Sequence, residues 1–244
     1  MGQDARLAAV LAALVSPGSG ELVGGDPQMC ATVLGVDGVA VSVLTDTDGF
    51  ERVWSSPGTS SLLEDLQFTV GEGPGADSAR SRSLVLVPDL AMVPAGRWPL
   101  LLPAVQELGV RAVFCFPLRI GGASLGVFTV QRSSRGPLTL AQIDSALILG
   151  ATLTAVLPRR AAPGHPFMQQ EGTGGGLHRA AIHQATGMIS VQASLSLDQA
   201  LALLRAHAYR RERPLEDVAD EVVTRRLHFR DTYEGTALPS QTEG

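Results

Sequence analysis

A proline- and glycine-rich segment divides the chain into two parts of different composition. Pro158 to Gly176 contains three Pro and five Gly among its 19 residues and shows no apolar periodicity. Such a segment acts as a linker, because Pro stiffens the chain and Gly leaves it free to turn. We therefore predict a first domain over residues 1–157, a linker over 158–177, a second domain over 178–230 and a flexible tail over 231–244.

The residue types that are missing narrow the chemistry of the chain. All 19 basic residues are Arg, and neither Lys nor Asn occurs. The absence of Lys excludes the phosphate-binding P-loop, Schiff-base chemistry and Ser-x-x-Lys acylases. The five His residues all lie at or after His165, so the first domain has no His to ligate haem or zinc or to act as a general base. Since no nucleophile–base pair can be assembled there, we predict a protein that is not an enzyme and holds no metal or cofactor.

Signals for secretion or membrane insertion are weak. Two Cys residues, Cys30 and Cys115, are too few for a secreted disulfide framework. The apolar stretch from Leu7 to Val15 is short and has mixed charge on its flank, unlike a signal peptide. We find no apolar run that approaches the roughly 18–20 residues needed to span a bilayer. We therefore expect a cytoplasmic protein without a membrane partner.

Apolar periodicity in the first domain predicts an antiparallel sheet with helices on its faces. Helices are predicted at 4–15, from 60 to 66, in a short turn ending near 82, at 98–108 and at 138–157. Strands are predicted at 36–44, 51–56, 84–87, 112–120 and 124–132, and the apolar run 84–87 is expected to be a buried strand. Gly121-Gly122 joins the last two strands as a hairpin, and Thr139 is the expected N-cap of the last helix.

These residues resemble a GAF domain. The resemblance rests on the order of elements, on GEGPGADSARSRSLVLVPDL (71–90), on Arg97-Trp98 and on GVRAVFCFPLRIGGASLGVFTV (109–130), and it covers essentially all of residues 1–157. It is closest in kind to the GAF subtype of actinobacterial transcription regulators, in keeping with the Arg-only composition. The resemblance implies an α+β sensory module that can bind a small ligand against its sheet and that dimerises through its terminal helices.

The sequence does not name a ligand for this module. The cyclic-nucleotide signature of the family requires Asn and Lys, and bilin attachment pairs a Cys with a nearby His; neither set is present. Five aromatic residues are candidates for an unidentified ligand in an apolar pocket, although core packing would use the same residue types: Trp54, Trp98, Phe114, Phe116 and Phe128.

Two other features of the first domain are interpreted as structural. Gly71-x-Gly73-x-x-Ala76 matches a dinucleotide fingerprint, but Pro74 removes an N–H donor and Glu72 adds a negative charge, so we interpret it as a tight turn. The two thiols have no basic neighbour in the sequence to lower their pKa, and we expect both to be inert.

The second domain contains three short helical patterns. The first covers 178–193 and carries a Gly at position 187; the second begins after Ser196 as N-cap; the third begins at Pro214. Short connections and one apolar stripe on each helix predict an all-α three-helix bundle.

This bundle resembles an ANTAR domain, the RNA-binding module of transcription antitermination regulators. The resemblance rests on the following blocks and their spacing: Gln184-Ala185-x-Gly187-Met188, Ala200, Leu203-Leu204-Arg205, Ala208 and Leu215-x-x-Val218-Ala219. Thr186 stands where the family often has Lys or Ile, and Glu212 where it commonly has Asn. The resemblance implies binding to hairpin loops of a structured leader RNA.

The Arg residues of the second domain support RNA binding, because a guanidinium donates paired hydrogen bonds to phosphate and stacks on exposed bases. From charge alone, the same Arg residues could instead be ordinary solvent-exposed charges at the C-terminal ends of helices, where the helix dipole favours them. We expect the Arg205 guanidinium to be exposed, and Gly187 to lie either at the RNA surface or at a helix–helix contact. The predicted RNA-binding residues are Arg179, Gln184, Ala185, Thr186, Gly187, Met188, Arg205, Ala208, Tyr209, Arg211, Glu212 and Arg213.

Together these features predict a signal-responsive transcription antitermination regulator. The alternative is a GAF-based scaffold whose helical bundle binds a protein partner. A homodimer is expected through a seam of apolar residues on the two terminal helices of the first domain, unless these residues only cover their own sheet: Leu7, Val10, Leu11, Leu14, Ile143, Leu147, Leu149 and Leu153.

Overall fold

The structure is a computed structural model that describes residues 3–16, 22–44, 50–160 and 176–229. The chain divides into two compact units, Met1–Gln170 and Glu171–Gly244, each described here by itself. The predicted tail over 231–244 lies outside the described residues. Both ends of the segment predicted as a linker are helical, because one helix runs to Arg160 and the next begins at Gly176.

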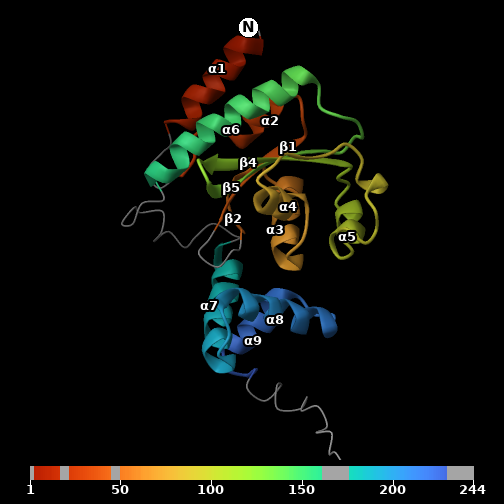
Figure 1. Ribbon diagram of the computed structural model, residues 1–244, viewed down its shortest axis with the longest axis vertical. Helices are drawn as coiled ribbons and strands as arrows, with labels where there is room; N and C mark the ends of the chain where they lie inside the picture. Colours follow the sequence, from red (N-terminus) through yellow and green to blue (C-terminus); the bar gives the residue numbers. More distant parts are fainter. Residues whose placement is uncertain (1–2, 17–21, 45–49, 161–175, 230–244) are drawn as a thin grey trace, which may run out of the picture. The chain divides into compact units, whose positions relative to one another are not determined.

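A five-stranded antiparallel sheet forms the centre of the first unit (Figure 1). Its strands are β1 (Gly38–Leu44), β2 (Phe50–Ser55), β3 (Val85–Val87), β4 (Ala112–Ile120) and β5 (Ala123–Arg132). Their order across the sheet is β2-β1-β5-β4-β3. β4 and β5 form the predicted hairpin, with Ile120 opposite Ala123 at its closed end. The antiparallel sheet expected from the sequence is therefore confirmed.

Helices cover both faces of this sheet (Figure 1). One face carries α1 (Gln3–Leu14), α2 (Pro27–Leu34) and α6 (Leu140–Arg160), and the other carries α3 (Thr59–Val70), α4 (Pro74–Ser81) and α5 (Leu101–Glu107). A 3-10 turn (Leu90–Met92) follows β3. Each face has its own hydrophobic core, because successive strand residues point to opposite sides: Phe114 belongs to the core on the α6 side, whereas Cys115 belongs to the core on the side of α3, α4 and α5.

The sequence analysis missed α2, although the residues at its ends mark it. The Asp26 side chain accepts a hydrogen bond from the N–H of Gln28 (2.8 Å), Pro27 occupies the first turn, and Gly35 ends the helix in the left-handed conformation (φ 64°). This arrangement of N-cap, Pro and C-terminal Gly is a start-and-stop signature. The helix spans only 8 residues, too few for its apolar period to be evident.

β3 is an edge strand, whereas the sequence predicted a buried one. It pairs with β4 alone, from Val85 opposite Cys115 to Val87 opposite Val113. Leu84 and Leu86 are exposed, so no element among the described residues covers these two side chains. The run of apolar residues does not distinguish a fully buried strand from a short edge strand.

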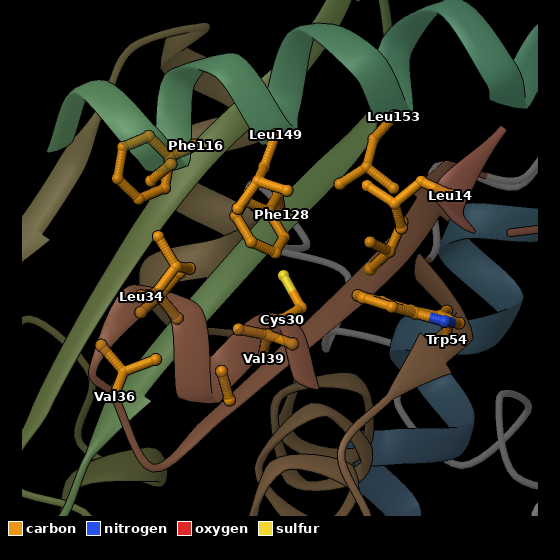
Figure 2. Packing of buried hydrophobic residues seen from close by; sticks show 14 of the residues in the cluster. Leu14, Cys30, Leu34, Val36, Val39, Trp54, Phe116, Phe128, Leu149 and Leu153 are labelled. Atoms are coloured by element: carbon orange, nitrogen blue, oxygen red, sulfur yellow. The ribbon is translucent and has the colours of Figure 1, made fainter. Parts of the chain in front are cut away.

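α6 corrects the expectation about apolar segments. Its window Leu140–Leu157 has 18 residues, a mean hydropathy of 1.7 and enough apolar character to cross a membrane by length and composition. One face of this helix packs on β4 and β5, with Ala146, Leu149 and Leu153 fully buried. Figure 2 shows Leu149 and Leu153 pointing into this core. α6 is thus a core helix of the first unit whose other face is also apolar. Thr139 caps it as predicted, its Oγ1 accepting from the N–H of Gln142 (3.2 Å).

Most of the residues that the sequence analysis predicted for a dimer interface are buried or partly buried within their own protomer. Val10, Leu14, Leu149 and Leu153 are buried against the sheet of their own protomer. The seam residues Leu7, Leu11 and Ile143 are partly buried against the same core. Among the named positions on the two helices, only Leu147 is substantially exposed. The periodic apolar stripe is therefore the face that covers the sheet, the alternative considered above.

Three helices form the second unit: α7 (Gly176–Ala193), α8 (Leu197–Arg210) and α9 (Leu215–Val223). α7 and α8 meet at 105°, and both contact α9. Ser196 and Gln199 form a capping box at the start of α8. The chain after α9 returns to α7, where the N–H of Phe229 donates to Oε1 of Gln192 (3.0 Å). The predicted three-helix arrangement is confirmed.

Candidate nucleic-acid interface

Four Arg residues gather around the turn between α8 and α9, and we call them the arginine cluster: Arg210, Arg211, Arg213 and Arg226. Their proximity shows in two neighbouring groups. Arg211, Arg210 and Arg213 each disfavour the protonated form of His207, while Arg213, Arg226 and Arg211 each favour the ionised form of Glu221. Arg210, Arg211 and Arg226 are exposed. The turn therefore presents several guanidinium groups to solvent on one part of the unit.

Two contacts fix the shape of this turn. Arg213 forms a forked ion pair with Glu221, with both distances at 3.0 Å, and this hydrogen bonding lowers the pKa of the Glu221 carboxyl. The N–H of Arg213 also donates to the carbonyl of Ala208 (3.0 Å), which closes the end of α8. Arg213 thus braces the turn onto α9 and has less freedom to grip a partner than Arg210 or Arg211.

Glu212 occupies a strained position in the middle of the cluster. Its φ is 52°, the left-handed region that Gly or Asn adopts more readily than Glu. Its side chain is exposed, so nothing in the core requires Glu there. The carboxylate also adds a negative charge between two Arg residues. This charge makes Glu212 the residue of the turn that opposes an anionic partner.

His207 lies beneath the cluster, buried against the chain that follows α9. Its ring meets Phe229 edge-on, with centroids 5.1 Å apart and planes at 64°. Burial, and then the charges of Arg211, Arg210 and Arg213, hold the pKa of His207 below its ordinary value of 6.5. A neutral imidazole is therefore part of the folded second unit.

Acidification is expected to weaken the second unit. His207 binds a proton more readily in the unfolded chain, where its pKa is about 6.5, so stability falls as pH drops from about 7.5 through that value. Far-UV circular dichroism should detect this loss of helix, whereas Trp fluorescence reports the first unit because both Trp residues lie there. His207→Phe should remove the dependence. The exposed His228→Gln should retain it, and an identical pH profile in His207→Phe would contradict the assignment.

The structure separates the predicted RNA-binding residues into buried and accessible groups. Ala185, Thr186 and Ala208 are buried in the helix packing, and the Thr186 hydroxyl donates to the carbonyl of Ile182 (2.7 Å). Their side chains cannot form part of an exposed surface. Gln184, Tyr209, Arg211 and Glu212 are exposed, and Gly187, Met188 and Arg213 are half-exposed. The side chain of Arg179 lies outside the described residues.

Arg205 is a correction to the sequence analysis. It follows the core residue Leu204, and we expected its guanidinium to be exposed. The side chain is instead partly buried, its Nε is shielded from solvent, and desolvation lowers its pKa to about 10. Arg205 therefore belongs to the packing of α8 more than to the accessible surface. Arg210, which the sequence analysis left out of the site, takes its place in the cluster.

Gly187 is not at a helix–helix contact. A Cβ placed on it would meet no atom of the described residues within 4 Å. A Gly within a helix costs about 1 kcal/mol of stability relative to Ala. Packing among the described residues of the unit therefore does not require a small residue at this position.

The five aromatic residues proposed for a ligand pocket do not come together. Trp54, Phe116 and Phe128 lie in the core beneath α6, and Phe114 belongs to the same cluster (Figure 2). Trp98 lies in the core on the opposite face of the sheet. All five are buried by their neighbours. They form core packing on two sides of the sheet, and none of them lines the two hollows described below.

A polar network occupies the space between α3 and the sheet. The Ser42 hydroxyl donates to Glu64 (2.5 Å), Gln67 Nε2 donates to the other Glu64 oxygen (3.1 Å), and Gln67 Oε1 accepts from the N–H of Gly75 (2.9 Å). A Cβ on Gly73 would overlap the Gln67 side chain. Close packing against Gln67 therefore accounts for Gly73, and the left-handed C-cap of α3 (φ 73°) accounts for Gly71, as the tight-turn interpretation requires.

Two acidic residues, Glu72 within this motif and Asp77 directly after it, hold α5 and the residues that precede it. Glu72 accepts from the N–H groups of Leu100 (2.6 Å) and Leu101 (3.0 Å) at the start of the helix. Asp77 accepts from the Trp98 indole (3.2 Å) and pairs with Arg97 (3.2 Å). The resemblance residues of segment 71–98 are thus explained by packing and capping.

The two thiols lie in apolar surroundings. Cys30 and Cys115 are both free and buried. Burial raises the pKa of Cys30 to about 12 and also raises the pKa of Cys115. A protonated, inaccessible thiol is a poor nucleophile, in agreement with the prediction. Within the described part of the chain, no group of three His, Cys, Asp or Glu residues is placed to hold a metal ion.

Comparison with known families assigns both units. Residues 28–157 match the GAF domain, and residues 177–223 match the ANTAR domain. The chain belongs to the GAF domain family and carries an ANTAR domain after its GAF domain. Both are regulatory, non-catalytic modules, and their combination is that of a transcription antitermination regulator whose C-terminal module binds RNA.

Solved structures show the same fold for the first unit. The GAF domain of an Acinetobacter phosphoenolpyruvate-protein phosphotransferase is 16% identical, with a TM-score of 0.51 over 67% of this chain and 99% of that one. The corresponding domain from Coxiella burnetii is also 16% identical, with a TM-score of 0.51 over 66% of this chain and 96% of that one. No curated protein matches the chain.

Proposed function

We propose that the protein is a signal-responsive, actinobacterial-type antitermination regulator that acts in the cytoplasm and binds hairpin loops of a leader RNA through the turn between α8 and α9. The observation that carries the proposal is the arginine cluster beside Tyr209, whose side chain is 67% exposed. Arg residues bind phosphate by forked hydrogen bonds, and an exposed aromatic ring stacks on an unpaired base. Bound hairpins would hold the antiterminator fold and prevent the terminator hairpin from forming.

The open side of Gly187 supports the same proposal. Gln184, Gly187 and Met188 lie one turn apart on α7 and are at least partly accessible. Because no side chain of the unit fills the space at Gly187, an RNA backbone can approach the helix closely there. We propose that this part of α7 contributes shape recognition, while the arginine cluster contributes charge.

RNA binding by the full chain should depend on Glu212 in the direction opposite to the Arg residues. We expect Glu212→Asn to raise the affinity for a two-hairpin leader RNA several-fold, since it removes a negative charge among the Arg side chains. The same change should stabilise the second unit by about 0.5–1 kcal/mol, because Asn tolerates positive φ better than Glu. Filter binding at two salt concentrations and helix melting measure the two effects.

The matched control is Glu216→Gln, an acidic residue exposed in the first turn of α9. It changes the net charge equally at a position without positive φ. Equal affinity gains in both variants would show that only net charge matters. Absence of RNA binding by the wild-type chain would overturn the proposal and favour a protein partner for the helical bundle.

We also propose that two GAF units dimerise through the outer face of α6. Leu140 is 80% exposed, Leu147 46% and Ile148 47%, which is unusual for three large apolar residues on one helix. A dimer would place two RNA-binding units on one two-hairpin RNA and raise the apparent affinity by avidity.

Substitution on this face should separate the protomers. Leu147→Glu together with Ile148→Glu is expected to convert a dimer into a monomer in sedimentation equilibrium, since four carboxylates would be buried at the interface. Met92→Glu, at an exposed apolar residue of another element, is the control. A wild-type chain that sediments as a monomer at micromolar concentration would refute the dimer.

A further inference from the structure

Two hollows flank a single Arg on the helical layer formed by α1, α2 and α6. The smaller, about 180 Å³, lies between α1 and α2 and is walled mainly by apolar side chains: Ala9, Val10, Ala13, Leu14 and Met29. The larger, about 420 Å³, is open to solvent and includes the polar residues Thr32, Thr139 and Gln142. Arg6 of α1 lines both. The aromatic residues considered from the sequence line neither.

The charge at this junction is uncompensated within the described residues. Arg6 is exposed and has no hydrogen-bond or ion-pair partner among them. Asp26 follows Gly25, which lies against Ala13 and Leu14 at the end of α1 away from Arg6. Its carboxylate already accepts from the N–H of Gln28 as the cap of α2. The hollow therefore combines an apolar interior, one guanidinium at the junction with the larger hollow and one carboxylate at its far end.

The walls are built to keep the small hollow open. The carbonyl of Gly25 accepts a hydrogen bond from the Trp54 indole (3.2 Å), which holds the backbone of Gly25 in place. A side chain at this position would crowd Ala13, because a Cβ on Gly25 would lie 3.0 Å from the Ala13 Cβ. Leu14 and Val10 form the buried floor, while Met29 at the rim is half-exposed and adaptable in shape. For comparison, a dry apolar cavity of roughly 150 Å³ can hold a benzene molecule.

We propose that the GAF unit binds a small apolar monocarboxylate between α1 and α2. The aromatic or branched apolar part occupies the small hollow, and the carboxylate pairs with Arg6 where the two hollows meet. Asp26 disfavours a second negative charge on the apolar part. The site lies on the helical side of the sheet that carries α6, away from the face covered by α3, α4 and α5.

This proposal deepens the sensor role proposed above by naming the class of ligand, and it does not depend on RNA binding. A ligand held jointly by α1 and α2 would fasten α1 onto the layer that also contains α6. Since α1 contacts both α2 and α6, occupancy is transmitted to the helix that leads out of the GAF unit.

Benzoate is the probe for this site, measured by titration calorimetry on the full chain. We expect saturable binding, with benzamide, the neutral analogue of the same shape, at least tenfold weaker. Terephthalate, which carries a second carboxylate across the ring, should bind more weakly because that charge faces Asp26. Phenyl phosphate tests whether a phosphate group is preferred to a carboxylate at Arg6. Trp54 lies behind Gly25 and should report binding by a change in fluorescence.

Two variants distinguish the charge from the cavity. Arg6→Gln should weaken benzoate at least tenfold while leaving benzamide unchanged, and Ala9→Phe should abolish both by filling the hollow. Arg6 and Ala9 are exposed, so both variants should fold, as circular dichroism checks. Arg119→Gln removes the same charge from a residue that lines neither hollow and should bind benzoate like wild type.

Three outcomes would overturn the proposal. Undetectable benzoate binding at millimolar concentration would show that the hollow is no site for this class. Equal affinity of benzoate for wild type and Arg6→Gln would remove the role of the guanidinium. Tighter binding of phenyl phosphate than of benzoate would replace carboxylate by phosphate as the recognised group. RNA binding can be present or absent in each case, so the two proposals fail independently.

Discussion

Replacement of Arg210, Arg211 and Arg226 together by Gln is expected to lower the affinity for leader RNA about a hundredfold or more, with the helices still folded. All three side chains are exposed around the same turn, so they can reach phosphate together. Each lost phosphate contact should also reduce the slope of log affinity against log salt by about 1. Filter binding between about 50 and 200 mM salt measures both quantities.

The control carries the same charge change on the GAF unit. Arg82, Arg111 and Arg119 replaced by Gln remove three positive charges without touching the α8–α9 turn. This variant should retain nearly all of the RNA affinity. Equal losses in the two triple variants would mean that RNA responds to the overall charge of the chain, and the turn would no longer be the interface.

Gly126→Ala is expected to destabilise the GAF unit by about 3 kcal/mol, among the largest effects of any single methyl group in this chain. Gly126 lies in β5, between β1 and β4, and its Cβ would overlap the Ser42 carbonyl oxygen and the Val43 Cα of β1. Backbone atoms cannot move aside as a flexible side chain can, so the pairing of β1 with β5 must distort. Loss of Trp fluorescence signal on heating or in urea measures the change.

Gly122→Ala provides the comparison within the same hairpin. A Cβ on Gly122 meets nothing within 4 Å among the described residues, so its stability should change by no more than about 0.5 kcal/mol. The second unit should melt as in wild type in both variants, because Gly126 lies in the other compact unit. A Gly126→Ala chain as stable as wild type would show that the sheet relaxes around the added methyl group.

Sequence periodicity predicted most of the fold, because the burial of one face of each helix and strand determines where apolar residues recur. The alternation of Phe114, Cys115 and Phe116 in β4 is visible in the sequence, and so are the caps at Ser196 and Thr139. Periodicity does not say which side of the sheet a loop-borne residue will reach. Trp98, which precedes α5, was therefore grouped with aromatic residues that pack on the opposite face.

The RNA interface was predicted less well, because small differences in how each helix is rotated about its axis decide which side chains are buried and which are exposed. Ala185 and Ala208 carry the resemblance to the ANTAR domain, but they do so as packing residues. Arg205 turns partly inward although it is charged. The positive φ of Glu212 is not evident from Glu itself, which is unusual in that conformation. The Asn that the ANTAR family commonly has at this position was the available signal.

The short edge strand β3 has a consequence for how copies of this protein avoid unwanted assembly. β3 pairs with β4 only as far as Cys115, and Pro117 follows on β4, where the outer edge is no longer paired. Pro has no amide hydrogen to offer to an incoming strand, and a three-residue edge gives little template for one. Strand addition and fibril growth along this side of the sheet are therefore discouraged, even at the high local concentrations that polysomes create during synthesis.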